Sequence, residues 1–358
     1  MAPNTTGNVT PDSKKSKSLN RIRSVGKALT VKKILKQPIK TETPEDDYDT
    51  DLEIDTSEDY NSRQKEHRMA ISRQDTDIGH HSYEEACAKF GSIPLRRVLS
   101  QLWSTHMNLQ HLGLNINEMK ALSVALMHNT RIEELDLDDN GLNGKCVNYV
   151  ADLLKTNYFI TKLNLNNNDI GEKGAVVISE TLQTTNWLTH VSLSGTHLGD
   201  DGMAYIANGL EENMTVQWLD LSHNTIGVNG GLHIGRLLGK NNTIEYIDLS
   251  WNQIRLAGAV AVCKSLQKNK GLSMMNVSWN GLSFEGSLAV GEALKSNKML
   301  ATLDLTNNRI NWECIPYIGR GLRVNKSLQV LEVITDTNLQ HVHFINCSIL
   351  LIRIPNGA

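Results

Sequence analysis

Apolar residues return along this chain at a fixed spacing of 28 residues. In residues 132–142 they stand at Ile132, Leu135, Leu137 and Leu142, around a single Asn140. The same arrangement starts again in seven consecutive units, whose first apolar residues are Ile132, Ile160, Leu188, Val216, Ile244, Leu272 and Leu300. A fixed period of this length predicts a solenoid, because one unit alone cannot bury its apolar face and must pack it against its neighbours.

Each unit divides into a strand half and a helix half. Around the L-x-L segment apolar and polar residues alternate, which predicts a short strand with one buried face, and the following Asn turns the chain. In the second half apolar residues lie four apart, as in Ile206 and Leu210, which predicts a helix. A small residue follows the first of each pair and is expected to let helix and sheet approach closely: Ala207, Gly235, Cys263, Gly291 and Gly319.

A strand and a helix in every unit predict an α/β fold, in which parallel strands form one sheet and helices cover its outer side. Neighbouring strands lie about 4.8 Å apart, while neighbouring helices need about 8–10 Å. This difference predicts a horseshoe whose concave face carries the strands.

The pattern L-x-x-L-x-L-x-x-N-x-L is that of leucine-rich repeats, and the 28-residue unit with its helical half resembles the ribonuclease-inhibitor type of this family. The run at residues 82–114, which ends in Met107-Asn108-Leu109-Gln110-His111-Leu112-Gly113-Leu114, is similar to the start of the leucine-rich repeat-containing 74 proteins. The resemblance implies a leucine-rich-repeat horseshoe. It leaves the function open, because the same scaffold carries inhibitors, GTPase activators, innate-immune sensors and actin-capping proteins.

The pattern divides the chain into four parts. Residues 1–81 combine many charges with few aromatic residues and no sustained periodicity, so we expect them to be disordered. Residues 82–106 are expected to form a helical N-terminal cap: Ser82 and Glu85 have capping-box spacing, Gly91 ends the first helix and Pro94 suits the first turn of a second. Residues 107–335 then hold about eight repeats. Residues 336–358 form an irregular tail, which is either an improvised cap or a truncated end that exposes a strand edge.

Charge is divided unevenly within the first part. Residues 1–40 hold ten Lys and Arg against one acid, and residues 41–60 hold ten acids and no base. Residues 19–35 place apolar residues near helical spacing within the basic part. This tail therefore either forms a basic amphipathic helix or stays solvated beside the acidic block, and it is the only part from which we expect membrane contact.

The absence of targeting segments and the pattern of cysteines favour a location inside the cell. The first residues lack the apolar segment of a secretory signal, and no run approaches the roughly 18 residues of a membrane span. Five scattered cysteines form no C-x-x-C pair, which is typical of a reducing compartment. We therefore expect an intracellular, cytoplasmic protein.

Motifs for catalysis are missing from the sequence. There is no G-x-x-x-x-G-K-[ST], no H-E-x-x-H, no zinc-ligand spacing and no G-x-S-x-G. His341 and His343 stand without a further ligand pattern around them. We therefore expect a protein that is not an enzyme and that uses no cofactor, no metal and no small-molecule substrate.

A column of Asn residues recurs where each predicted strand ends. Buried side-chain amides at these points can satisfy turn backbone groups, which otherwise cost about 1 to 3 kcal/mol each, so we interpret the column as structural. Thr196 replaces the Asn in one repeat. The column consists of Asn140, Asn168, Asn224, Asn252, Asn280 and Asn308.

The register also indicates which side chains point from the strands into the concave face, since they alternate with the buried leucines. One such column is acidic and rich in hydrogen-bonding groups: Asp136, Asn164, Ser192, Asp220, Asp248, Asn276, Asp304 and Glu332. Phosphate binding needs a basic surface, so this face disfavours nucleic acid. It favours a protein partner with a basic surface.

Two flanking columns bring aromatic residues together over three adjacent units. An aromatic cluster ringed by polar groups has the composition of a protein-binding hot spot. The alternative for Trp251 and Trp279 is that a Trp before the Asn packs over the strand exit as a recurrent feature of the repeat. The predicted partner-binding residues are Trp218, Asp220, His223, Tyr246, Asp248, Trp251, Met274 and Trp279.

These observations favour a non-enzymatic protein–protein interaction scaffold that binds its partner on the concave face. The family resemblance leaves two alternatives. The first is a GTPase-activating protein, although the acids here precede the repeats and do not follow them. The second is an actin- or cytoskeleton-capping protein, for which residues 19–35 give the local support.

Overall fold

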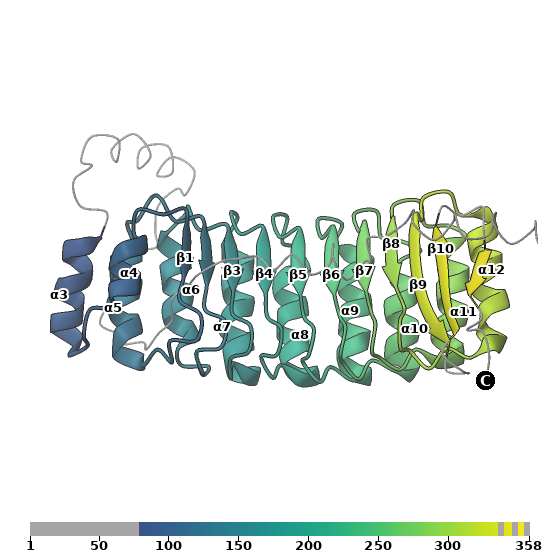
Figure 1. Cartoon of the computed structure of the whole chain (residues 1–358), viewed down its shortest axis with the longest axis horizontal. Coiled ribbons are helices and arrows are strands. Elements are labelled where there is room, and N and C mark those ends of the chain that lie inside the picture. The colour runs from purple at the N-terminus through teal and green to yellow at the C-terminus, as the bar shows by residue number, and fades with distance from the viewer. Residues whose placement is uncertain (1–78, 336–339, 346–349, 354–358) are drawn as a thin grey trace, which may run out of the picture. The chain divides into compact units, whose positions relative to one another are not determined.

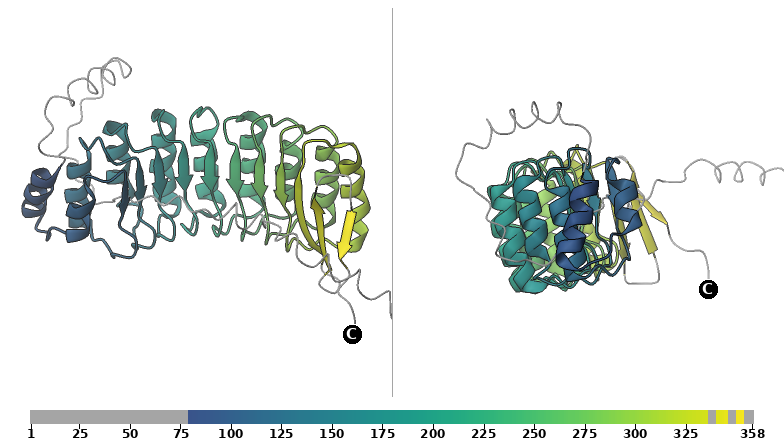
Figure 2. Two further views of the ribbon diagram at one scale, coloured as in Figure 1. Left: turned by 45° about the horizontal axis from the view of Figure 1, so that its top comes forward. Right: turned by 90° about the vertical axis from the view of Figure 1, so that its left-hand side faces the viewer.

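The computed structural model describes residues 79–335, 340–345 and 350–353. The charged segments of residues 1–60, and with them residues 19–35, lie outside the described residues. In the described part, short strands alternate with helices along the chain. The strands form one sheet and the helices form a layer on one side of it (Figures 1 and 2).

The strands of the repeats follow one another across the sheet in chain order, and neighbours are parallel from β1 to β9. They are β1 (His106–Asn108), β2 (Glu134–Asp136), β3 (Lys162–Asn164), β4 (His190–Ser192), β5 (Trp218–Asp220), β6 (Tyr246–Asp248), β7 (Met274–Asn276), β8 (Thr302–Asp304) and β9 (Val330–Thr335). Residues 28 apart stand opposite each other, as Leu219 does to Ile247. The α/β repeat fold predicted from the periodicity is confirmed.

Two helices precede β1, and from α5 on the helices connect successive strands and return the chain to the start of the next strand. They are α3 (His80–Phe90), α4 (Arg96–Gln101), α5 (Ile116–Leu126), α6 (Val147–Thr156), α7 (Gly171–Thr184), α8 (Gly199–Leu210), α9 (Val228–Lys240), α10 (Leu256–Ser265), α11 (Ser283–Leu294), the 3₁₀-helix η1 (Trp312–Cys314) and α12 (Ile315–Val324). Their apolar pairs four residues apart, such as Ile206 and Leu210, are fully buried. The core therefore lies between the sheet and the helix layer, where each repeat packs on its neighbours.

The N-terminal helix begins earlier than the capping-box spacing predicts. Helix α3 starts at His80 after Gly79, and no side chain caps it, so Ser82 lies inside the helix. Gly79 has φ 103°, and a Cβ there would lie 2.6 Å from the carbonyl oxygen of Ala125 in α5. Close packing on α5 thus sets where α3 begins. Gly91 ends the helix as predicted, with φ 71°.

Two described stretches beyond residue 336, residues 340–345 and 350–353, form strands. After β9 the chain forms β10 (Gln340–Ile345) and β11 (Leu350–Arg353), which are antiparallel to their neighbours. These two stretches are strands, whereas the sequence predicted an irregular tail over residues 336–358.

The small residues in the helices face the next helix, which corrects the expectation that they bring helix and sheet together. A Cβ on Gly235 would lie 2.7 Å from the backbone of Ala261, and one on Gly291 would lie 2.4 Å from the carbonyl oxygen of Tyr317. Gly319 in α12 has no atom within 4 Å of such a Cβ. The column therefore sets the spacing between consecutive helices.

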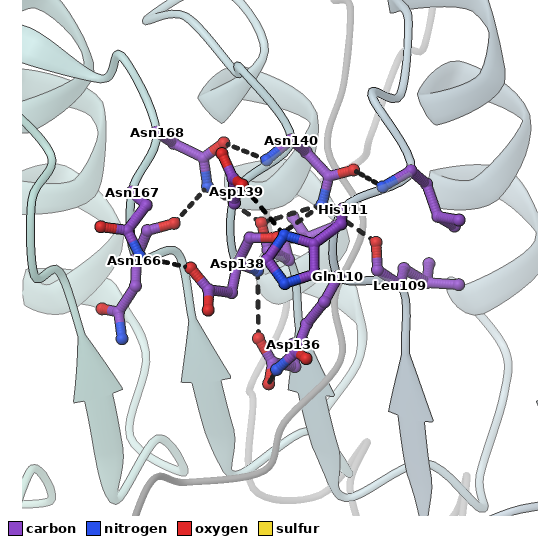
Figure 3. A network of polar contacts seen from close by, with 12 residues as sticks. Leu109, Gln110, His111, Asp136, Asp138, Asp139, Asn140, Asn166, Asn167 and Asn168 are labelled. Carbon is purple, nitrogen blue, oxygen red and sulfur yellow. Dashed lines mark hydrogen bonds and ion pairs between the residues drawn. The ribbon is translucent and has the colours of Figure 1, made fainter.

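The Asn column at the strand exits forms a ladder of buried amides (Figure 3). The Nδ2 of Asn140 donates to the carbonyls of Leu109 and Leu137, at 3.0 and 2.9 Å. The Oδ1 of Asn168 accepts from the backbone N–H groups of Asn140 and Leu142, at 3.1 and 3.0 Å. Each amide thus joins two repeats, as expected for a structural column. At Thr196 the hydroxyl donates to the carbonyl of Leu193 instead, at 2.8 Å.

A second Asn column, which the sequence analysis did not identify, lies where the helices end. The Nδ2 of Asn241 donates to the carbonyls of Leu210 and Asn213, both at 2.8 Å, and its Oδ1 accepts from Thr243 and Ile244. The same 28-residue spacing was the available signal. The column consists of Asn129, Asn157, Asn213, Asn241, Asn269, Asn297 and Asn325.

Candidate protein-binding site

A ladder of stacked rings runs across β4, β5 and β6. Because parallel strands put equivalent residues side by side, His190 stands opposite Trp218 and Trp218 opposite Tyr246. The ring centroids of Trp218 and Tyr246 are 4.6 Å apart with planes 6° from parallel. The His190 ring extends the stack, 6.2 Å from Trp218. We call these three residues the strand ladder.

A second ladder lies one turn further on, where the strands end. The ring centroids of Trp251 and Trp279 are 4.0 Å apart, and His223 stacks on Trp251 at 5.3 Å. Trp251 and Trp279 remain 47% and 41% exposed. We call His223, Trp251 and Trp279 the exit ladder.

The exit ladder has an unusual backbone. Its residues have φ of 56° to 58°, in the left-handed region that bulky side chains rarely adopt. Other repeats place Asp139, Asn167 or Gly195 at this position, which are residues that tolerate it. The tight turn before the ladder Asn imposes this conformation on every repeat, whatever the side chain.

Acidic residues lie in the column between the two ladders. Asp220 stands opposite Asp248 on the neighbouring strand. The Oδ2 of Asp248 accepts from the Nδ2 of Asn276 at 2.9 Å and from the Tyr246 hydroxyl at 3.4 Å. The Oδ2 of Asp220 accepts from the Ser192 hydroxyl at 3.5 Å. The second oxygen of each carboxylate accepts a backbone N–H two residues ahead.

Burial perturbs the titration of this column. Burial, and next the charge of Asp248, raise the pKa of Asp220 to about 7. Burial also raises the pKa of Asp248. The pKa of His190 is lowered to about 4, first by burial and then by the charge of Lys162, so this ring is neutral at pH 7. The column between the ladders therefore holds two carboxyl groups that ionise less readily than free Asp side chains.

The structure brings the eight predicted residues to three neighbouring repeats, but with different exposure than expected. Tyr246 is only 2% exposed and Asp248 7%, so neither belongs to an open rim. Trp218, Asp220 and Met274 are partly buried, and His223 is exposed. The side chains of neighbouring strands cover much of Asp220 and Asp248, whereas the exit ladder lies beyond the strand ends and stays more exposed. The acidic surround predicted from the sequence is therefore a floor between two aromatic walls, not an exposed ring.

Two polar residues belong to this groove although the predicted site omitted them. His190 completes the strand ladder, and Asn276 holds the Asp248 carboxylate. Both stand in the columns that the register defined, so the signal was present in the sequence. We call the surface made by the two ladders and by the column of Asp220 and Asp248 between them the aromatic groove.

Metal and membrane features were also searched in the described part of the chain. Residues 79–333 contain no cluster of three His, Cys, Asp or Glu side chains arranged to hold a metal ion. No helix among the described elements is long and apolar enough to cross a membrane.

Comparison with known proteins identifies the repeats. The family model described as Leucine Rich repeat matches residues 156–179, 185–207, 212–235 and 240–263. The aromatic groove begins within these matches, which contain Trp218, Tyr246 and Trp251. The matched residues are therefore leucine-rich repeats, and the repeated strand–helix units form an α/β leucine-rich-repeat solenoid.

One solved structure similar to this chain is described as Leiomodin-1 Actin-Binding Site 2. It is 19% identical in sequence, with a TM-score of 0.25, and the match covers 52% of this chain and 78% of that chain. The finer resemblances to the ribonuclease-inhibitor type and to the leucine-rich repeat-containing 74 proteins stay predictions from the sequence.

Proposed function

We propose that this protein is a non-enzymatic interaction scaffold that captures a basic segment of a protein partner in the aromatic groove. The observation that carries the proposal is the arrangement of two stacked aromatic ladders on either side of the paired carboxyl groups of Asp220 and Asp248. Leucine-rich repeats present extended surfaces of this kind to protein partners.

The aromatic walls supply most of the contact area. Trp and Tyr rings bury large areas with little loss of side-chain freedom, and they are the residues most often found at binding hot spots. Stacking fixes the rings before the partner arrives, so little ordering is left to occur on binding. The exposed faces of Trp251 and Trp279 are therefore suited to an apolar or planar side chain.

The acidic floor selects the charge of the partner. Asp220 and Asp248 repel each other when both are ionised, which contributes to the raised pKa of Asp220. A Lys or Arg side chain placed between the ladders replaces the missing counter-charge, and its cation is also attracted to the faces of the flanking rings. A carboxylate in the same place meets only repulsion. We therefore expect a partner with a basic surface.

Fluorescence anisotropy tests this proposal with a labelled peptide in which lysine and arginine alternate with leucine. Trp218→Ala in the full chain should weaken binding at least tenfold. Trp103→Ala is the matched control, because Trp103 is an exposed Trp outside the groove. Equal binding by both variants, with folding intact by circular dichroism, would contradict the proposal.

A second pair of variants tests the charge rule. Asp220→Asn together with Asp248→Asn should reduce the preference for the basic peptide over its glutamine analogue. Because residues 1–40 of the chain are themselves basic, the same titration is made on a full chain whose first ten Lys and Arg are replaced by Gln. Tighter peptide binding by that chain identifies the tail as a competitor for the groove.

The alternatives from the family resemblance are tested directly. A GTP-hydrolysis assay with candidate small GTPases examines the first, and co-sedimentation with actin filaments examines the second. If Trp218→Ala reduces either activity, that activity uses the same groove.

A further inference from the structure

A further depression lies next to Trp279, where the strands of the sheet end. It is an open pocket of about 560 Å3 between the turns that follow β6, β7 and β8. Its lining consists of Asn252, Gln253, Arg255, Trp279, Asn280, Gly281, Asn307 and Arg309. We call it the arginine pocket.

The pocket is held open by backbone contacts between repeats. The N–H of Gly281 donates to the carbonyl of Ile254 at 2.9 Å, and Gly281 pairs with Arg255 in an isolated bridge. A Cβ on Gly281 would lie 3.1 Å from the Cβ of Arg255. A side chain at position 281 would therefore crowd the base of the Arg255 side chain, and the glycine keeps this part of the pocket free.

The groups available to a ligand are mostly cationic. Asn252 and Asn280 line the pocket, but their amides already hold backbone carbonyls in the ladder. Arg255 and Arg309 are exposed, and no carboxylate in the described part of the chain lies within 4.0 Å of either guanidinium. No acidic residue lines the pocket. Two positive charges thus face the pocket without a counter-charge from the described residues.

An apolar stripe continues from the pocket onto the outer side of the helices. Leu256 follows Arg255 directly, and Phe284 and Trp312 stand at the same position of the next two repeats. These three side chains are 64%, 39% and 66% exposed. Each stands at the start of a helical segment, in α10, α11 and η1, and these elements contact one another in chain order. We call these three residues the outer stripe.

We propose that the arginine pocket and the outer stripe together form a docking site for an acidic segment of a protein partner that also carries bulky apolar side chains. A carboxylate matches the planar fork of a guanidinium and forms paired, charge-assisted hydrogen bonds with it. The apolar side chains of the same segment cover the outer stripe, which is otherwise left in water. The ring of Trp279 forms the wall toward the aromatic groove.

This site is opposite in charge to the aromatic groove and uses different polar groups. The groove accepts a cation on Asp220 and Asp248, whereas the pocket accepts an anion on Arg255 and Arg309. The scaffold therefore offers two neighbouring surfaces of opposite charge on the repeats from β4 to β8. They share the ring of Trp279 but no charged residue.

The test is an anisotropy titration of the full chain with a short labelled peptide in which glutamate alternates with leucine. Arg255→Gln together with Arg309→Gln should weaken binding at least tenfold. The matched control is Arg96→Gln with Arg97→Gln on α4, which removes two exposed positive charges at the other end of the described repeats and should leave binding unchanged. An equal loss of peptide affinity in both double variants would show that only the net charge of the chain matters, and it would overturn the proposal.

Further arms separate the contributions and the possible occupants. Leu256→Ser with Trp312→Ser should weaken binding severalfold, and a peptide with glutamine in place of glutamate should bind poorly; if it binds equally well, the pocket does not recognise carboxylates. Asp220→Asn should have no effect on binding of this acidic peptide, so that failure of the arginine pocket and failure of the aromatic groove remain distinguishable.

In a final variant the ten acids of residues 41–60 are neutralised. Tighter peptide binding by this chain would assign the pocket to the chain's own acidic segment and overturn a partner as its occupant.

Discussion

The rings of Trp251 and Trp279 stack 4.0 Å apart, although both residues have a left-handed backbone with φ 56°. For a bulky L-residue this conformation costs about 1 to 2 kcal/mol. A stacked aromatic pair returns about 0.5 to 1.5 kcal/mol. The stacking energy therefore does not exceed the cost of the strained backbone, so stability alone does not favour Trp over Asn or Gly at this position. We infer that the exposed ring faces serve recognition.

Replacement of Trp251 by Asn should separate stability from binding. Asn tolerates the left-handed backbone, so its smaller strain offsets the lost stacking, and we expect the free energy of unfolding to change by less than about 1 kcal/mol. Binding of the basic peptide should fall at least tenfold. Urea unfolding and anisotropy measure the two effects. A large loss of stability with unchanged peptide binding would instead assign the Trp to packing over the strand exit.

Restoring the amide ladder at its break should stabilise the fold. In neighbouring repeats the ladder Asn joins two carbonyls and two N–H groups, as Asn252 does with Leu221, Leu249, Asn224 and Ile226. The side chain of Thr196 has only a hydroxyl for this purpose, which contacts the carbonyl of Leu193 and the Oδ1 of Asn224. We expect Thr196→Asn to raise the free energy of unfolding by about 1 kcal/mol, and the reference change Asn252→Ala to lower it by about 2 to 4 kcal/mol. Urea denaturation followed by circular dichroism measures both. A lower midpoint for Thr196→Asn would show that this cavity is shaped for Thr.

Alanine substitution at two equivalent glycines should change the free energy of unfolding in opposite directions. Gly291 and Gly319 hold the same position in α11 and α12, but only Gly291 meets the backbone of a following helix, at Tyr317. Gly291→Ala should lower stability by about 1 to 3 kcal/mol through overpacking. Gly319→Ala should raise it by about 0.5 to 1 kcal/mol through helix propensity. Thermal unfolding of the two variants is the measurement, and a shift of the same sign for both would contradict the packing.

Stability should fall as the pH rises across the titration of Asp220. A free Asp ionises near pH 4, whereas Asp220 holds its proton until about pH 7 in the folded protein. Between these values the folded state binds more protons than the unfolded state, so this contribution is present below pH 4 and lost above pH 7. Asp220→Asn removes it, so the stability of the variant relative to the parent should increase from pH 5 to pH 8. Asp201→Asn, an exposed residue of α8, is the control and should show no such trend.

Binding of the basic peptide should show the opposite trend. The cation binds the ionised carboxyl pair, so association releases protons and becomes tighter between pH 5.5 and pH 8. His190 does not reverse this trend, because its pKa of about 4 leaves it neutral throughout. Asp220→Asn should flatten the dependence, as measured by anisotropy or by calorimetry in two buffers. A peptide affinity independent of pH in the unmodified chain would argue against contact with this pair.

The sequence alone determined the repeat, its register and the role of the Asn ladder. These follow from local periodicity, since a 28-residue spacing places Trp218 beside Tyr246 and Asn140 beside Asn168 in any parallel solenoid. For the same reason the columns that build the aromatic groove could be written down before the structure was known. The second Asn column at the helix ends carried the same signal.

Only the tertiary structure decided how exposed the residues of those columns are and which neighbouring elements they contact. Exposure depends on neighbours in three dimensions, so periodicity does not show that Asp248 and Tyr246 are buried while Trp251 projects beyond the strand ends. Packing on α5 moved the start of α3 away from Ser82, and the next helix gave Gly291 a contact that Gly319 lacks. The arginine pocket likewise arises where turns from three repeats meet, which no single motif in the sequence specifies.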